Sequence, residues 1–133
     1  MLINYSNHPS ARWTAEQIQA AQAAYGDIYD IPFPAVPVEL GSGEVLQEAM
    51  TETERILKVL STREDDHNAV MCQGEFTLTF AVTALLQKAG VRVVCAVSDR
   101  VTRETVENGV PVKVSEFRFA GFRVYADLPA VFQ

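Results

Sequence analysis

The chain has 133 residues, of which 48% are hydrophobic and 21% are charged. This composition is that of a globular domain with a hydrophobic core, and it argues against disorder. The formal net charge of −6 disfavours non-specific binding of long DNA or RNA, because such binding depends on neutralising many phosphates. A short or cyclic nucleotide in a local basic pocket is compatible with this charge.

The sequence has no run near the roughly 18 apolar residues of a membrane span, and its first residues do not resemble a signal peptide. Its two cysteines, Cys72 and Cys95, lie in apolar strand-like runs and indicate buried thiols in a reducing compartment. Two cysteines and two distant histidines make no zinc spacing, so we expect no metal and no cofactor. We therefore expect a cytoplasmic protein with a single domain, residues 1–133.

Apolar periodicity and turn residues predict the elements in chain order. Thr14 and Gln17 form a capping box that begins the first helix, Gly26 ends that helix, and Asn108 with Gly109 marks a hairpin. The predicted strands are 1–5, 27–31, 69–72 and 91–97, followed by a hairpin at 101–117 and a last β segment at 117–125; the predicted helices are 14–25, 43–62 and 77–89.

Strands that alternate with helices predict parallel strands joined by right-handed crossovers. The expected fold is therefore α/β, a Rossmann-like three-layer fold with a mainly parallel central sheet, helices on both faces and a C-terminal antiparallel β-hairpin. Ligands of such sheets bind outside the carboxyl ends of the strands. This rule selects four loops, at 6–13, 32–37, 73–77 and 98–100.

The first of these loops holds Ser6, Asn7, His8, Ser10 and Arg12 and leads into a helix N-terminus. Free backbone N–H groups at such an end attract anions such as phosphate. A ligand role competes with a local one, in which Ser6 and Asn7 only satisfy the loop backbone and His8 only precedes a turn proline.

The loop at 73–77 begins with Gln73 and Gly74, and a glycine there lets the backbone pass close to a ligand. Glu75 is either an acid or base, or a charge that favours the helix N-terminus. Thr77 or Thr79 either caps the helix or contacts a phosphate. The pattern is neither a Walker loop nor a dinucleotide fingerprint.

Ser98, Asp99 and Arg100 follow the fourth predicted strand. Arg100 is either a bidentate phosphate ligand or the partner of Asp99 in a turn. His67 lies in a charged turn at the opposite edge of the sheet, where we expect a solvated side chain.

Four stretches, LINYSNHPSARWT, DIYDIPFPAV, CQGEFTLTFAVTALLQKAGVRVVCAVSDR and FRFAGFRVY, resemble the small stand-alone CARF-like (CRISPR-associated Rossmann fold) ring nucleases associated with type III CRISPR systems. The resemblance extends from Met1 to Tyr125, and SNHPS with a following tryptophan, and GEFTLTFA, are its distinctive parts. It implies a homodimer that binds cyclic oligoadenylate, in particular cyclic tetra-adenylate, across its two-fold axis.

The resemblance also implies cleavage without a metal, in which the 2′-hydroxyl of the substrate attacks the adjacent phosphate and leaves a 2′,3′-cyclic phosphate. Such a reaction needs orientation and charge stabilisation. Loop 6–12 and turn 73–79 form the implied pocket, with His8, Arg12 and Glu75 as catalytic candidates. The ligand-binding candidates are Ser6, Asn7, Ser10, Gln73, Gly74, Thr77, Thr79, Ser98 and Arg100. The chain departs from a typical anion-binding protein in its net charge and in having no lysine in the candidate loops.

The expected activity is thus that of a ring nuclease that ends cyclic oligoadenylate signalling in antiviral defence. We expect the phosphates at the N-termini of the first and third helices, where unpaired N–H groups attract anions even in an acidic protein. Two alternatives remain open: a sponge or sensor that binds the ring without cutting it, and an unrelated nucleotide-binding regulatory domain.

Overall fold

The computed structural model describes residues 1–63 and 65–130. Within them, five strands form a sheet in the order β2-β1-β3-β4-β5. The strands are β1 (Leu2–Ser6), β2 (Ile28–Pro32), β3 (Ala69–Gln73), β4 (Arg92–Glu107) and β5 (Val110–Val124). Strands β1 to β4 run parallel to one another, and β5 runs antiparallel to β4. The predicted α/β class, with its mainly parallel sheet and C-terminal antiparallel hairpin, is confirmed.

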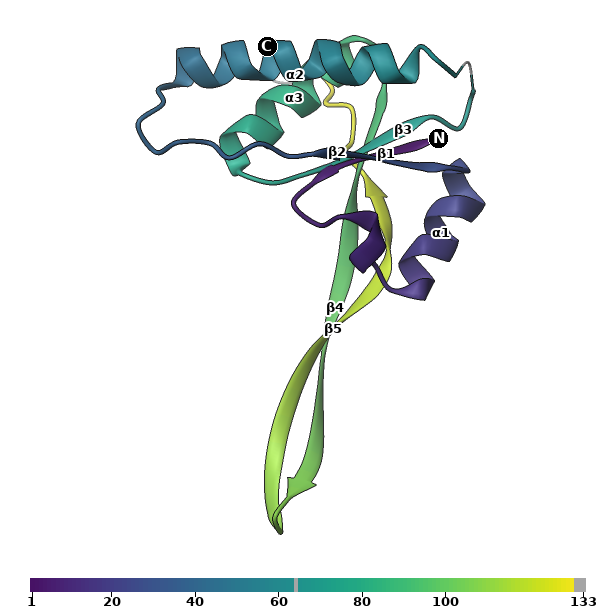
Figure 1. Ribbon diagram of the computed structural model, residues 1–133, viewed down its shortest axis with the longest axis vertical. Coiled ribbons are helices and arrows are strands. Elements are labelled where there is room, and N and C mark those ends of the chain that lie inside the picture. Colours follow the sequence, from purple (N-terminus) through teal and green to yellow (C-terminus); the bar gives the residue numbers. More distant parts are fainter. Residues whose placement is uncertain (64, 131–133) are drawn as a thin grey trace.

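Helices cover both faces of this sheet (Figure 1). Helix α1 (Ala15–Tyr25), which follows the short 3₁₀ helix η1 (Ser10–Arg12), lies on one face, and α2 (Ser42–Leu60) and α3 (Phe76–Lys88) lie on the other. All five residues of β1 are buried. Because successive side chains of a strand point to opposite faces, Leu2 belongs to the core on the α1 side, whereas Ile3 and Tyr5 belong to the core under α2 and α3.

The ends of α1 are those that the sequence predicts. Thr14 Oγ1 accepts a hydrogen bond from the Gln17 N–H at 3.3 Å, and Gly26 has a φ of +86°, a conformation that glycine adopts without strain. Neither Thr77 nor Thr79 caps α3, which is one of the two roles that the sequence leaves open for them, and Glu75 takes the helix-terminal role that the sequence offers as an alternative. Glu75 is the N-cap, because its longer side chain reaches forward and places a negative charge at the positive end of the helix dipole.

Strands β4 and β5 are each continuous, whereas the sequence predicts separate β segments at 91–97, 101–117 and 117–125. The sequence suggests a loop at 98–100, but Ser98, Asp99 and Arg100 continue β4 and pair with β5. Opposite charges across the two strands favour this pairing: Asp99 lies opposite Arg118, and Arg103 forms an ion pair of 2.6 Å with Glu116.

The distal part of this hairpin, residues 98–119, projects from the domain on the α1 side of the sheet and is called the arm below (Figure 1). A β-bulge between Val97 and Ser98, which leaves Ala120 without a Cα partner, lies where the arm leaves the sheet. The turn at its tip is the one predicted, since Asn108 and Gly109 both have positive φ, +50° and +77°.

Both cysteines are free, Cys72 buried and Cys95 partly buried. Burial raises the pKa of the Cys72 thiol to about 11, so this side chain stays protonated and unreactive at neutral pH. In the described part of the chain, no helix combines the length and the apolar character that crossing a membrane requires.

Candidate functional site

A pocket of about 270 Å³ lies at the carboxyl ends of β1 and β3, on the α1 side of the sheet. Four of its residues are predicted site residues from three separate loops or strands: His8, Arg12, Gln73 and Ser98. The complete lining is His8, Arg12, Trp13, Thr14, Gln17, Met71, Gln73, Ala96 and Ser98. The first turn of α1 borders the same space, so N–H groups of a helix N-terminus lie in a pocket that Arg12 and His8 also line.

The pocket lies where β3 and β4 part from each other. Their paired residues end at Met71 and Val94. Beyond that point the side chain of Gln73 replaces the sheet ladder, because its Oε1 accepts a hydrogen bond of 2.6 Å from the Ala96 N–H. Gln73 and Ala96, which lie on the two strands at this point, both line the pocket.

The main chain of His8 is held from three sides. Its carbonyl oxygen accepts hydrogen bonds from Asn4 Nδ2 at 2.8 Å and from Trp13 Nε1 at 2.9 Å. Its N–H donates to Ser6 Oγ at 3.1 Å. These bonds fix the backbone of the loop, and His8 is one of the residues that line the pocket. The positioning of His8 thus depends on a buried asparagine and on the tryptophan that follows the loop.

A second set of bonds ties the same loop to β2. Asn4 lies opposite Asp30 in the register of β1 and β2, and Asn4 Nδ2 donates to Asp30 Oδ1 at 3.0 Å. Asp30 Oδ2 accepts from both the N–H and the hydroxyl of Ser10, at 3.1 and 3.0 Å. Ser6 Oγ donates to Asn4 Oδ1 at 2.6 Å. Ser6 and Ser10, which we expected to bind ligand, therefore hold the loop, and Asn7 lines a neighbouring hollow with Asn4 and Asp30.

The structure separates the α3 candidates from this pocket. The carboxylate of Glu75 accepts hydrogen bonds from the N–H groups of Leu78 and Thr77, at 2.8 and 3.0 Å, and from the Thr77 hydroxyl. These bonds lower its pKa and keep it ionised. The expected phosphate site at this helix end is replaced by a carboxylate of the chain itself. Thr79 Oγ1 is buried within α3, on the other side of the sheet from the pocket.

Packing within the fold also explains why position 74 is a glycine. A Cβ at this position would lie 2.6 Å from the ring of Phe33, so the close approach that the glycine permits is to an aromatic side chain of the core. Arg100, the last ligand candidate, lies on β4 beyond Ser98, in the arm.

Sequence reasoning missed a row of aromatic side chains beside the pocket. Trp13 lies 6.4 Å from Phe122 between ring centroids, and Phe122 contacts Phe119 edge to face at 5.2 Å. Tyr25 of α1 packs on Phe122 at 5.8 Å. Phe117 and Phe119 alternate in the sequence, but Phe122 joins their face only because the β-bulge at Val97 and Ser98 shifts the register. The row lies along the same face as the pocket.

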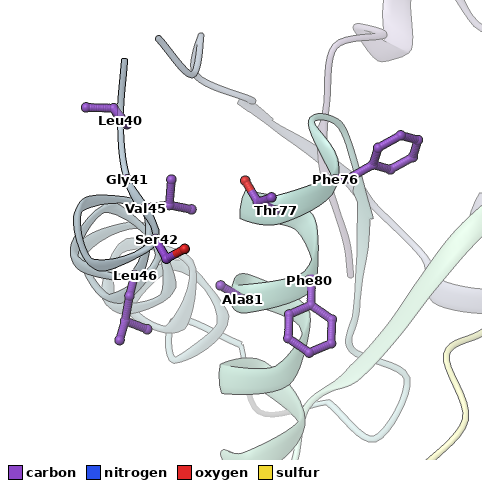
Figure 2. Close-up of a pocket in the computed structure, with 9 residues that line it drawn as sticks. All are labelled: Leu40, Gly41, Ser42, Val45, Leu46, Phe76, Thr77, Phe80 and Ala81. Carbon is purple, nitrogen blue, oxygen red and sulfur yellow. The ribbon is translucent and has the colours of Figure 1, made fainter. Parts of the chain in front are cut away.

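Another cavity lies on the other face of the sheet, between the first turns of α2 and α3 (Figure 2). It has a volume of about 470 Å³, and most of its lining is apolar. Figure 2 shows Phe76 and Phe80 projecting from α3 and Leu46 from α2. Phe76 is 90% exposed and Phe80 75% exposed. Thr77 is the one candidate residue in this groove.

The fold and the pocket define a small α/β protein with a Rossmann-like sheet, a polar pocket at the carboxyl ends of its strands and a long antiparallel arm. The chain matches the model of the Uncharacterized protein MJ1673 family over residues 1–123 and belongs to that family. No curated protein matches it, and no solved structure does.

Proposed function

We propose that the protein binds cyclic oligoadenylate, cyclic tetra-adenylate in particular, in the pocket of His8 and Arg12, and cleaves it without a metal. The observation that carries the proposal is the meeting of His8, Arg12, Gln73 and Ser98 in one cavity beside a helix N-terminus. A cation, an imidazole and amide and hydroxyl groups are the chemistry that a phosphodiester of RNA requires. The resemblance to the CARF-like ring nucleases supports the same substrate.

Each pocket residue has a role in this proposal. Arg12 holds a phosphate by charge-assisted hydrogen bonds. Trp13 and the adjoining phenylalanines offer a surface for an adenine base. Gln73, which accepts a hydrogen bond through its Oε1, keeps its amide N–H groups as donors for the ligand. Removal of the ring by this protein is the step that ends type III CRISPR signalling in antiviral defence.

In the proposed reaction, the 2′-oxygen of one adenosine attacks the adjacent phosphorus, and the bond from phosphorus to the 5′-oxygen breaks. The products are a 2′,3′-cyclic phosphate and a free 5′-hydroxyl. His8 accepts the proton of the 2′-hydroxyl, since an imidazole suits proton transfer near neutral pH, and solvent returns a proton to the 5′-oxygen. Arg12 stabilises the charge that develops on the phosphate oxygens.

The test is incubation of the protein with cyclic tetra-adenylate in EDTA, followed by chromatography. Linear oligoadenylate ending in a 2′,3′-cyclic phosphate is the expected result. A stable complex without cleavage replaces the enzyme by a sponge or sensor. If neither a complex nor a product forms, ring binding is overturned, and the unrelated nucleotide-binding regulatory domain becomes the better hypothesis.

The proposal includes a homodimer, and the apolar face of α2 and α3 is the surface we assign to it. Phe76 and Phe80 are 90% and 75% exposed, and Leu46 and Met50 are each 45% exposed. Together these four side chains present roughly 450 Å² of apolar surface. A standard interface buries about 800 Å² per partner, of which about 450–500 Å² is apolar. The exposed apolar area of these four side chains is therefore close to the apolar share of such an interface.

The occupant we assign to this face is a second copy of the chain, because two-fold pairing is the commonest closed assembly of identical chains. Such a dimer carries one pocket on each outer face, because the pocket lies on the α1 side of the sheet.

A further inference from the structure

The arm brings an arginine and an exposed phenylalanine next to the pocket. Ser98, which lines the pocket, pairs with Phe119, and two residues further along the arm Arg100 pairs with Phe117. Because side chains alternate between the faces of a strand, Arg100 and Phe117 share the face of Ser98 and Phe119. They therefore extend the pocket surface by one step along the hairpin.

The aromatic row continues in the same direction. It starts at Trp13 in the pocket, passes through Phe122 and reaches Phe119. Phe117 is the next residue of β5 on this face, and it is 78% exposed. The row thus leads from the aromatic cluster around Phe122 to Phe117, whose side chain is exposed.

The pocket is too small for a whole cyclic oligonucleotide, so such a ligand must also contact surface outside the pocket. A ligand pocket that buries a drug-sized molecule has about 300–1,000 Å³, so the pocket of about 270 Å³ accommodates about one nucleotide. The other nucleotides of a ring must contact surface outside it. The arm is the part of the same chain that adjoins the pocket through Ser98 and that carries both a cation and an exposed aromatic ring.

We propose that Arg100 and Phe117 form a second nucleotide subsite, in which an adenine stacks on the Phe117 ring and the neighbouring phosphate binds the Arg100 guanidinium. This inference rests on the proposed function, because it extends the same site to the next nucleotide of the ligand. Stacking on aromatic side chains along a basic surface is the usual way in which proteins bind single-stranded nucleotides.

The test compares the binding of AMP with that of the dinucleotide pApA by calorimetry, in the parent protein and in Phe117→Ala. AMP fills the pocket alone, whereas pApA also reaches the arm. The parent protein is expected to bind pApA more tightly than AMP. Phe117→Ala should weaken pApA binding by roughly tenfold or more, which is the loss expected for one stacked base, and leave AMP binding unchanged.

Two further variants separate stacking from damage to the arm. Phe117→Trp keeps an aromatic face and should retain the preference for pApA. Val106→Ala removes a side chain of similar exposure, 73%, at the tip of the arm and should change neither affinity. Equal binding of AMP and pApA in the parent protein, or an unchanged preference in Phe117→Ala, overturns the subsite.

Cyclic tetra-adenylate distinguishes this result from a failure of the proposed function. A preference for pApA that depends on Phe117, in a protein that does not bind the ring, supports the subsite and overturns the ring as ligand. Binding of neither AMP nor pApA overturns the subsite.

Discussion

The indole Nε1 of Trp13 donates a hydrogen bond of 2.9 Å to the main-chain carbonyl of His8. The tryptophan that borders the pocket thus also holds the residue that we propose as the proton acceptor. Asn4 donates to the same carbonyl, so the position of His8 depends on two side chains that the sequence does not mark as functional. Binding surface and catalytic geometry are coupled at this one oxygen atom.

Trp13→Phe should keep an aromatic surface and lose this hydrogen bond. We expect the free energy of unfolding to fall by about 0.5–1.5 kcal/mol, as measured by urea denaturation. Cleavage of cyclic tetra-adenylate should slow more than binding weakens, because His8 loses one of its supports. Tyr25→Phe is the matched control, since it removes a polar group from the same aromatic cluster and leaves the indole bond intact. Equal cleavage rates in Trp13→Phe and the parent protein contradict the coupling.

The features that the sequence predicts correctly are set by neighbouring residues, whereas the features that it misses depend on contacts between distant segments. Thr14, Gly26 and the Asn108–Gly109 turn were predicted correctly because their conformations are set by neighbouring residues. The bonds between Asn4 and Asp30 were not, since they exist only because β1 pairs with β2 in one particular register. A polar residue inside a short apolar strand gives no indication of its partner.

The hairpin of the arm was predicted, but its continuity with β4 through residues 98–100 was missed for a different physical reason. Ser98, Asp99 and Arg100 look like a loop because they are polar and break the apolar run of β4. In the structure these three residues continue β4 beyond the helix-covered part of the sheet, where cross-strand pairing with β5 holds the strand. The candidate site was predicted in part: its first loop and Gln73 were found from the carboxyl-end rule, but the Glu75 cap and the aromatic row depend on packing.

Arg12→Ala should weaken the binding of cyclic tetra-adenylate by roughly 1.5–3 kcal/mol, which is the contribution of a charge-assisted hydrogen bond. Calorimetry with the uncleaved ring at low temperature measures this change. Arg118→Ala removes the same charge from the opposite face of the arm, where Arg118 pairs with Asp99. Equal losses in the two variants indicate a general effect of net charge and not a phosphate contact of Arg12.

His8→Ala should slow cleavage by about 10²–10⁴-fold and leave binding nearly intact, because general acid–base catalysis contributes that much to the rate. Single-turnover cleavage assays and calorimetry separate the two effects. His67→Ala is the control, since His67 lies in the turn with Asp65, away from the pocket. If binding and cleavage fall together in His8→Ala, the residue orders the loop and does not transfer a proton.

Glu52 should make the protein less stable at neutral pH than at mildly acidic pH. Its side chain is buried under α2, and this burial raises its pKa, an effect that Arg55 at 3.5 Å offsets only in part. The folded state then keeps the proton to a higher pH than the unfolded state. The free energy of unfolding therefore falls as pH rises from the usual range of a glutamate through the raised pKa.

Glu52→Gln removes this penalty and should raise the free energy of unfolding at pH 7 by about 1 kcal/mol. The same substitution should flatten the pH dependence above the usual glutamate range. Glu54→Gln, at an exposed position of the same helix, should change neither. Urea denaturation at a series of pH values provides the measurement, and an unchanged profile in Glu52→Gln shows that another group is responsible.

Phe80→Asp should dissociate the proposed dimer. The substitution places a charge in the centre of the apolar face of α2 and α3, where burial of an unpaired carboxylate opposes association. Light scattering at micromolar concentration should report a dimer for the parent protein and a monomer for the variant. Because Phe80 is 75% exposed in the single chain, the variant should keep the thermal stability of the isolated fold.

The pocket lies on the other side of the sheet, so the monomeric variant should still bind one ring per chain. A parent protein that is monomeric, or a variant that stays dimeric, rejects this surface, and one ring per dimer in the parent protein places the ligand across the two-fold axis instead.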